Sequence, residues 1–147
     1  MNSKEIVLAL MNAIQKGDFV EAESYLAPGF QARGAAPQPL NGAAWLRLSM
    51  ELKQAFPNLE YHFKVDGVEG EVVYISSELK GTHKGPLDLS AQQLGVIAPT
   101  RRSFATAHHH GQAIVTADKV SAWVMEPNTR AGLLAILKHL GVTPVLS

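Results

Sequence analysis

The 147-residue chain contains no cysteine. Disulfide bridges, zinc sites built from thiolates and a cysteine nucleophile are therefore excluded. A chain without cysteine also fits a reducing compartment. Any chemistry that this protein carries out must rest on oxygen and nitrogen side chains.

The sequence has no excess of either sign of charge, since lysine plus arginine and aspartate plus glutamate each total 13. Proteins that bind nucleic acid or anionic membranes usually present a basic face, and here only Arg101-Arg102 stands as a pair. Long hydrophobic runs are also missing, because Asn12 and Gln15 interrupt the apolar N-terminal stretch. That stretch predicts neither a signal peptide nor a membrane span. We expect a cytoplasmic protein with no nucleic-acid or membrane partner.

The first third of the chain has helical periodicity. Asn2 and Glu5 have the spacing of a capping box, and an apolar stripe then continues to Gly17, a residue typical of a helix end. Asp18 is placed to cap a second helix that ends near Leu26. A third helix is expected to begin at Asn41 and end at Pro57-Asn58.

From residue 59 onward the apolar residues alternate, which indicates strands. The four expected strands cover 59–65, 71–81, 101–116 and 119–126, and a short strand is also possible at 30–33. The long segment 83–100 is expected to cover another part of the molecule. A last helix is predicted to start at the cap Asn128-Thr129. Helices followed by an antiparallel meander predict an α+β fold, in a single domain over residues 1–147.

Half of the six histidines stand together in the stretch AHHHG at 107–111. Side chains alternate along a strand, so His108 and His110 share one face and His109 points to the other. His110 and Gln112 could face a ligand, or their face could be solvated while the face rich in small residues packs inward. Both readings stay open.

Several short stretches along the chain resemble, in order, the SnoaL-like polyketide cyclase family within the nuclear transport factor 2-like fold. They are Gly17-Asp18, YLAPGF at 25–30, Asn41-Gly42, AFPN at 55–58, GTHKG at 81–85, IAPT at 97–100 and HLG at 139–141.

The resemblance implies a cone, in which a curved antiparallel sheet packs around N-terminal helices and a C-terminal helix follows. It implies a mostly apolar cavity, a homodimer and no cofactor. The expected function is binding of a small hydrophobic carbonyl compound, with cofactor-free cyclisation or isomerisation by acid/base chemistry. The same fold also carries non-catalytic binding or assembly modules, so the sequence leaves open whether the protein is an enzyme.

Family cyclases place an aspartate four residues after a tryptophan at the end of the last strand. Here Trp123 is followed at that distance by Pro127, and the nearest carboxylate is Glu126. The family also places a glutamine and a histidine on the preceding strand, where this chain has His110 and Gln112. Glu126, His110 and Gln112 are therefore the expected catalytic residues, and the alternative for Glu126 is a solvated glutamate at a strand end. Comparison with the family pattern further predicts a bulge near Gly111 that reverses the facing of part of the strand.

The expected substrate-binding side chains are those that could line the cavity or its mouth. They are His83, His108, Tyr61, Tyr74, Trp45, Phe56 and Trp123. For His83 the alternative is a hydrogen bond to the loop backbone, and for the aromatic residues it is core packing. A metal site on His108 and His110 would need His83, Glu126 or His62 as a third ligand. We expect no metal.

Overall fold

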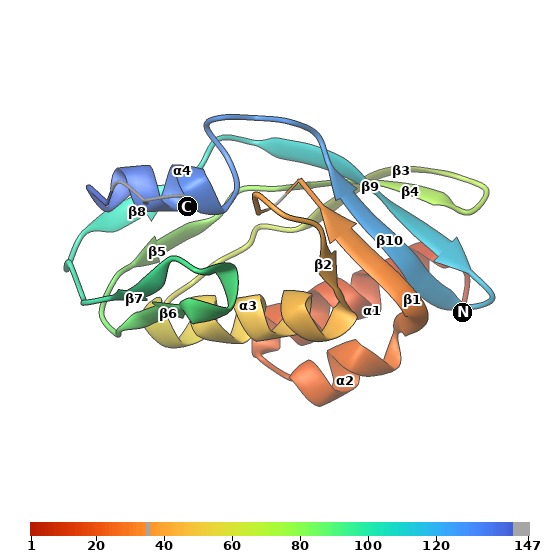
Figure 1. The fold of residues 1–147 in the computed structure, drawn as a ribbon. Helices are drawn as coiled ribbons and strands as arrows, with labels where there is room; N and C mark the ends of the chain where they lie inside the picture. The colour runs from red at the N-terminus through yellow and green to blue at the C-terminus, as the bar shows by residue number, and fades with distance from the viewer. Residues whose placement is uncertain (35, 143–147) are drawn as a thin grey trace.

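A curved six-stranded sheet wraps around three N-terminal helices (Figure 1). The computed structural model describes residues 1–34 and 36–142. Within these residues the sheet order is β2-β1-β10-β9-β4-β3. The strands are β1 Leu26–Arg33, β2 Leu40–Asn41, β3 Lys64–Glu69, β4 Val72–Ser77, β9 His109–Thr116 and β10 Lys119–Met125. The predicted α+β class, with a curved sheet and helices at both ends of the chain, is confirmed.

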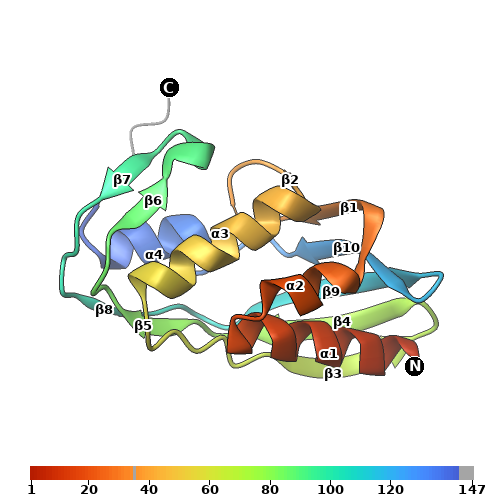
Figure 2. The same ribbon diagram turned by 90° about the horizontal axis from the view of Figure 1, so that it is seen from below.

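The helices are α1 Ser3–Lys16, α2 Phe19–Ser24, α3 Gly42–Ala55 and α4 Leu133–His139. Figure 2 shows α1 to α3 on one side of the sheet. The predicted capping box is confirmed, because the Glu5 amide donates to Asn2 Oδ1 at 2.8 Å and the Asn2 amide donates to Glu5 Oε1 at 3.1 Å. Among the described residues, no helix is both long and apolar enough to span a membrane.

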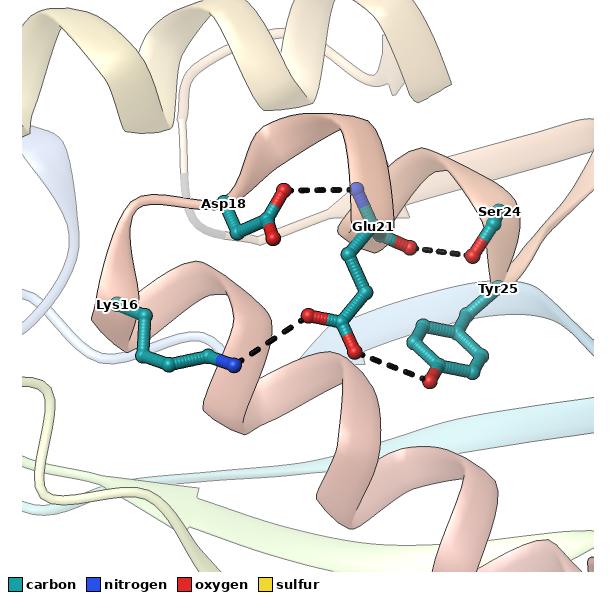
Figure 3. Close-up of polar contacts among 5 residues, drawn as sticks. All are labelled: Lys16, Asp18, Glu21, Ser24 and Tyr25. Atoms are coloured by element: carbon teal, nitrogen blue, oxygen red, sulfur yellow. Dashed lines mark hydrogen bonds and ion pairs between the residues drawn. The ribbon is translucent and has the colours of Figure 1, made fainter.

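A set of polar contacts fixes the corner between α1 and α2 (Figure 3). Asp18 Oδ1 accepts the Glu21 amide at 3.0 Å, which is the predicted cap. The Glu21 carboxylate then contacts Lys16 Nζ and the Tyr25 hydroxyl, each at 3.4 Å. Exposed pairs of this kind contribute little, so the cap is the main determinant of the corner. α2 ends at Ser24, two residues earlier than predicted.

One strand pair departs from the expected antiparallel arrangement. β1 pairs with β10 in parallel, while the other pairs of the large sheet are antiparallel. Hairpins force neighbouring strands to alternate in direction, but no hairpin connects β1 with β10. Between them the chain passes through β2, α3 and the strands β3 to β9, so no turn fixes their relative direction.

Two of the predicted long strands are interrupted at positions that lie side by side in the structure. The strand expected at 71–81 is split into β4 and β5 (Lys80–Thr82), and that expected at 101–116 into β8 (Ser103–Ala105) and β9. Thr106 bridges the break, since its amide donates to the Leu79 carbonyl at 2.9 Å and its hydroxyl accepts the Leu79 amide at 3.0 Å. The backbone polar groups at the break are thus satisfied while the sheet changes direction.

The break also reverses which side chains face inward. Phe104 and Thr106 are buried before it, whereas His109, Gly111 and Ala113 are buried after it. A reversal was predicted, but its predicted position near Gly111 is wrong, because Gly111 pairs regularly with strands on both sides. A Cβ at residue 111 would lie 2.4 Å from the Val124 carbonyl oxygen, so close strand approach explains this glycine.

The segment between β5 and β8 folds back onto α3, as the prediction of a covering segment required. It contains the hairpin of β6 (Leu87–Leu89) and β7 (Gly95–Ile97), joined by the 3-10 helix η1 (Ser90–Gln92). Leu87 and Leu89 are fully buried. The amides of Lys84 and Gly85 both donate to the Ala55 carbonyl, at 2.9 and 3.0 Å, and so anchor the segment to the end of α3.

His83 holds the two ends of this segment together. Its amide donates to the Arg102 carbonyl at 2.9 Å, its carbonyl accepts the Arg101 amide at 3.0 Å, and its Nδ1 accepts the Thr100 amide at 3.1 Å. The ring is buried against Phe56, with ring centroids 5.3 Å apart. Burial lowers the pKa of His83 below its ordinary value, and the Gly85 backbone offsets part of that effect.

We predict that His83 makes the protein less stable in mild acid. The pKa of His83 is lower in the folded chain than in the unfolded chain. The stability that the neutral, buried ring contributes is therefore complete above about pH 6.5, and it is lost as the pH falls towards the pKa of His83 in the folded chain. Thermal unfolding at about pH 7.5 and about pH 5.5 measures this effect. The melting temperature of His83→Asn should fall less between the two pH values than that of the wild type, because asparagine does not titrate. Parallel curves for the two proteins would contradict this role.

α4 begins later than the sequence predicts. Asn128 does not cap it; its Oδ1 accepts the Arg130 amide at 2.9 Å and its Nδ2 donates to the His108 carbonyl at 3.2 Å. The helix starts after Gly132, whose φ of 83° is in the region that favours glycine. Its Leu133 and Ile136 side chains are buried towards the sheet, whereas Leu134 is 41% exposed.

We predict that the inward face of α4 carries most of its docking energy. Ile136→Ala should lower the free energy of unfolding by about 2–5 kcal/mol, because it removes buried methyl groups. Leu134→Ala is the matched control on the same helix and should change it by at most about 0.5 kcal/mol. Urea unfolding measures both, and equal effects would show that α4 is not docked in this orientation.

Candidate functional site

A mostly apolar cavity of about 80 Å³ lies between the helices and the inner face of the sheet. Its wall includes Ile14 of α1, Leu48 and Leu52 of α3, Met125 of β10 and Ile136 of α4. Typical ligand pockets measure roughly 300–1,000 Å³. A ligand of ordinary size would therefore have to displace part of this wall.

A larger hollow of about 290 Å³ lies elsewhere, between residues 36–40 and 91–94. The polar side chains that line it are those of Gln38, Gln92 and Gln93. Amide side chains do not titrate, so the described lining of this hollow provides neither a general acid nor a general base. The cavity inside the cone does contain titratable side chains.

A continuous chain of aromatic rings crosses the cavity region. Phe30 of β1 contacts Trp45 of α3 with ring centroids 5.0 Å apart, and Trp45 contacts Trp123 of β10 at 5.3 Å. Trp123 then meets the edge of Phe63 at 6.0 Å, and Phe63 stacks on Tyr61 at 4.7 Å. Each such pair contributes about 0.5–1.5 kcal/mol beyond area burial, so this wall is rigid and strongly apolar.

His109 is the histidine that faces the cavity. It is 3% exposed, and its Nε2 lies 2.7 Å from the carbonyl oxygen of Glu126. A carbonyl can only accept, so Nε2 must carry the proton of this bond. In the neutral ring Nδ1 then carries a lone pair that can accept a proton. The neutral His109 ring can therefore act as a proton acceptor.

Tyr61 supplies a hydroxyl group to the same cavity. The hydroxyl is buried and has no hydrogen-bond partner among the described residues. Burial raises the pKa of Tyr61 well above its ordinary value, and the nearby Ser49 hydroxyl offsets part of that rise. The phenol therefore stays protonated and acts as a donor. Leaving a buried hydroxyl unpaired costs about 1–3 kcal/mol.

His109 and Tyr61 are the ionisable side chains in the described lining of the cavity. The other polar lining groups are the hydroxyls of Ser49 and Ser77, and Ser49 Oγ already donates to the Trp45 carbonyl at 3.1 Å. One neutral base and one neutral donor in an apolar cavity suit proton transfer on an uncharged molecule.

The three expected catalytic side chains lie outside this cavity. Glu126, His110 and Gln112 are all exposed. His110 and Gln112 alternate with the buried residues of β9, so they point to the outer face of the sheet. His110 Nδ1 lies 3.8 Å from the Asp66 carboxylate on that face. Of the two readings of β9, the structure selects the one with a solvated His110 face.

The expected substrate-binding residues divide into three groups. Trp45, Tyr61 and Trp123 line the cavity. Phe56 and His83 are buried outside it, where Phe56 packs edge-on against Phe104 at 4.8 Å.

His108 and Tyr74 form the third group, on the outer face. His108 Nδ1 contacts the Glu78 carboxylate at 2.5 Å, and the Tyr74 hydroxyl donates to Glu69 at 3.0 Å. The rings of His108 and His110 stack with centroids 5.8 Å apart. In the part of the chain that the structure describes, no group of three candidate ligands gathers around a possible metal position.

His109 was not singled out from the sequence, because His110 and Gln112 were expected to be the ligand-facing pair, and the alternative in which the small-residue face packs inward stayed open. The available signal was composition, since His109 shares its face with Gly111, Ala113 and Val115, which are typical of a buried face. Ser49 was not singled out, because a serine on the apolar face of a helix does not show from sequence whether it lines a cavity.

Comparison with known proteins gives a consistent result. Residues 4–125 match the family model described as SnoaL-like polyketide cyclase. No curated protein sequence is significantly similar to the chain.

Three solved structures share the fold over nearly the whole chain. A candidate SnoaL-like polyketide cyclase from Jannaschia sp. CCS1 is 21% identical, with a TM-score of 0.70, covering 97% of this chain and 93% of that one. The candidate hydroxylase AclR from Streptomyces galilaeus is 19% identical, with a TM-score of 0.69 and 97% of each chain covered. The candidate polyketide cyclase IdmH from Streptomyces antibioticus is 18% identical, with a TM-score of 0.69, covering 97% of this chain and 100% of that one.

These structural likenesses show the fold, while the family match spans most of the sequence and includes the strands that carry His109 and Trp123. The chain belongs to the SnoaL-like polyketide cyclase family.

Proposed function

We propose that the protein binds a small hydrophobic carbonyl compound in the cone cavity and catalyses cofactor-free cyclisation or isomerisation on it, with His109 as the base. The observation that carries this proposal is the buried His109, held in one tautomer by the Glu126 carbonyl inside an aromatic cavity. Glu126, His110 and Gln112, the residues first expected to catalyse, are exposed and have no part in the proposal.

The position of His109 compensates for the missing family aspartate. The resemblance places that aspartate at residue 127, where this chain has proline. His109 Nε2 bonds to the carbonyl of the preceding residue, Glu126, at 2.7 Å. The imidazole is therefore next to the position where the family pattern places its acid–base group. Imidazole is the side chain that most often acts as a general base in enzymes.

The chemistry follows from the groups present. His109 Nδ1 removes a proton from the carbon next to a carbonyl, and the electron pair of that C–H bond moves to give an enolate. In a cyclisation the enolate carbon attacks a second carbonyl of the same molecule, and the new alkoxide takes the proton that His109 removed. In an isomerisation the proton returns to a different carbon. Neither route needs an oxidant or a cofactor.

The alternative is a non-catalytic binding module on the same fold. Two observations favour it, namely the cavity volume of about 80 Å³ and the lack of a carboxylate in the described lining. A binding module would hold the ligand by apolar contact alone. Binding without any proton exchange would support this alternative.

We predict that the protein accelerates exchange of the α-protons of cyclohexanone in deuterated water, followed by NMR. His109→Gln should lower the exchange rate by at least about 100-fold, because glutamine can still donate to the Glu126 carbonyl but offers no base. His110→Gln is the control on the outer face and should exchange at the wild-type rate. Loss of exchange in His110→Gln but not in His109→Gln would overturn the assignment.

The homodimer expected from the family is also a proposal. Tyr74 of β4 and Val124 of β10 are large apolar side chains that are at least 36% exposed, and they lie on the outer face of the sheet on either side of Gln112 of β9. Exposed apolar side chains close together on one face of an open sheet are typical of an interface. Sedimentation equilibrium of the whole chain measures the oligomeric state directly.

A further inference from the structure

We propose that Tyr61 is the hydrogen-bond donor for the oxygen of the ligand, and that the cavity selects an uncharged ketone. This inference rests on the proposed function and deepens it, because it assigns a second residue and a substrate class to the same cavity. Tyr61 would touch the reacting molecule directly. Its role is complementary to that of His109, because Tyr61 donates a hydrogen bond and His109 accepts a proton.

Tyr61 is fixed in place from several sides. Its amide donates to Gln15 Oε1 at 2.8 Å, and its carbonyl accepts the Glu78 amide at 3.0 Å. Its ring stacks on Phe63 with an interplanar angle of 9°. The residue is 6% exposed. The hydroxyl is thus held in the cavity wall and does not reach bulk water.

The hydroxyl nevertheless has no partner among the described residues. Ser49 Oγ donates to the Trp45 carbonyl at 3.1 Å, and it lies near enough to lower the pKa of Tyr61, but it makes no hydrogen bond of ordinary geometry with the Tyr61 hydroxyl. Most buried polar groups in proteins are paired, and an unpaired one calls for an explanation. A ligand oxygen inside the cavity would complete the pairing.

The rest of the lining defines what the ligand carries. None of the described lining residues is a lysine or an arginine, so a carboxylate or phosphate would be buried without a counter-charge. Burial raises the pKa of Tyr61, so it offers a proton to an acceptor and does not itself become a base. An uncharged oxygen acceptor beside an acidic C–H bond, on an apolar body, meets these conditions. A ketone has both.

In the reaction Tyr61 would act on the charge that develops on oxygen. When His109 Nδ1 takes the proton from the α-carbon, the C–H electron pair forms a carbon–carbon double bond and the carbonyl electrons move onto oxygen. The Tyr61 O–H group donates to that oxygen throughout and keeps its own proton. A fixed donor is most effective where charge develops in the transition state. Return of the proton from His109 restores both groups.

The test compares Tyr61→Phe with Tyr25→Phe. Tyr25 is a matched control, because its hydroxyl has a partner in Glu21 and lies outside the cavity lining (Figure 3). The probes are cyclohexanone and methylenecyclohexane, which have the same shape but differ in the carbonyl oxygen. NMR titration measures the affinity of each protein for each probe, thermal unfolding measures stability, and α-proton exchange of cyclohexanone measures catalysis.

We expect Tyr61→Phe to unfold at the same temperature as the wild type or higher, because it removes an unpaired buried hydroxyl. It should bind cyclohexanone about tenfold more weakly and bind methylenecyclohexane unchanged. Its exchange rate should fall by more than its affinity does. Tyr25→Phe should keep wild-type affinity and exchange.

Two results would overturn the role of Tyr61. One is a lower unfolding temperature for Tyr61→Phe, which would show that the hydroxyl has a structural partner. The other is equal affinity of the wild-type protein for both probes, including no binding of either. Failure of the proposed catalytic function gives a different result. In that case the wild type and His109→Gln would exchange the α-protons at the same rate, while ketone binding would still depend on Tyr61.

Discussion

The break in the sheet at residues 78–79 and 106–108 is the constraint on which the site depends. Thr106 satisfies the backbone of Leu79 on both its amide and its carbonyl, so the two strands can change direction together without leaving buried polar groups unpaired. The same irregularity shifts the alternation of β9 by one residue. His109 therefore faces the aromatic cavity, and His110 faces outward.

The fold could be predicted from the sequence where local signals act alone. The capping box at Asn2 and the caps at Asp18 and Asn41 each depend on residues a few positions apart, and all three are present. The parallel pairing of β1 with β10 and the late start of α4 depend on contacts between distant segments. No local pattern determines them, and both differ from the sequence-based expectation.

The candidate site shows the same division more sharply. Trp45, Tyr61 and Trp123 were expected near a ligand, since large aromatic residues of an apolar cone usually line its interior, and they do line the cavity. Which way His109 points depends on one irregularity in the strand. A shift of the alternation by one residue turns every inward side chain outward and every outward side chain inward. Composition of the two faces would have been a better guide than strict alternation.

The bond between His109 and the Glu126 carbonyl has a consequence for how the site can change in evolution. The acceptor is a main-chain atom, so the tautomer of the imidazole is independent of which side chain occupies position 126. A substitution of the side chain at position 126 would therefore leave the acceptor of the His109 hydrogen bond in place. The tautomer of His109 is thus set by the path of the backbone after β10, and not by the chemistry of any neighbouring side chain.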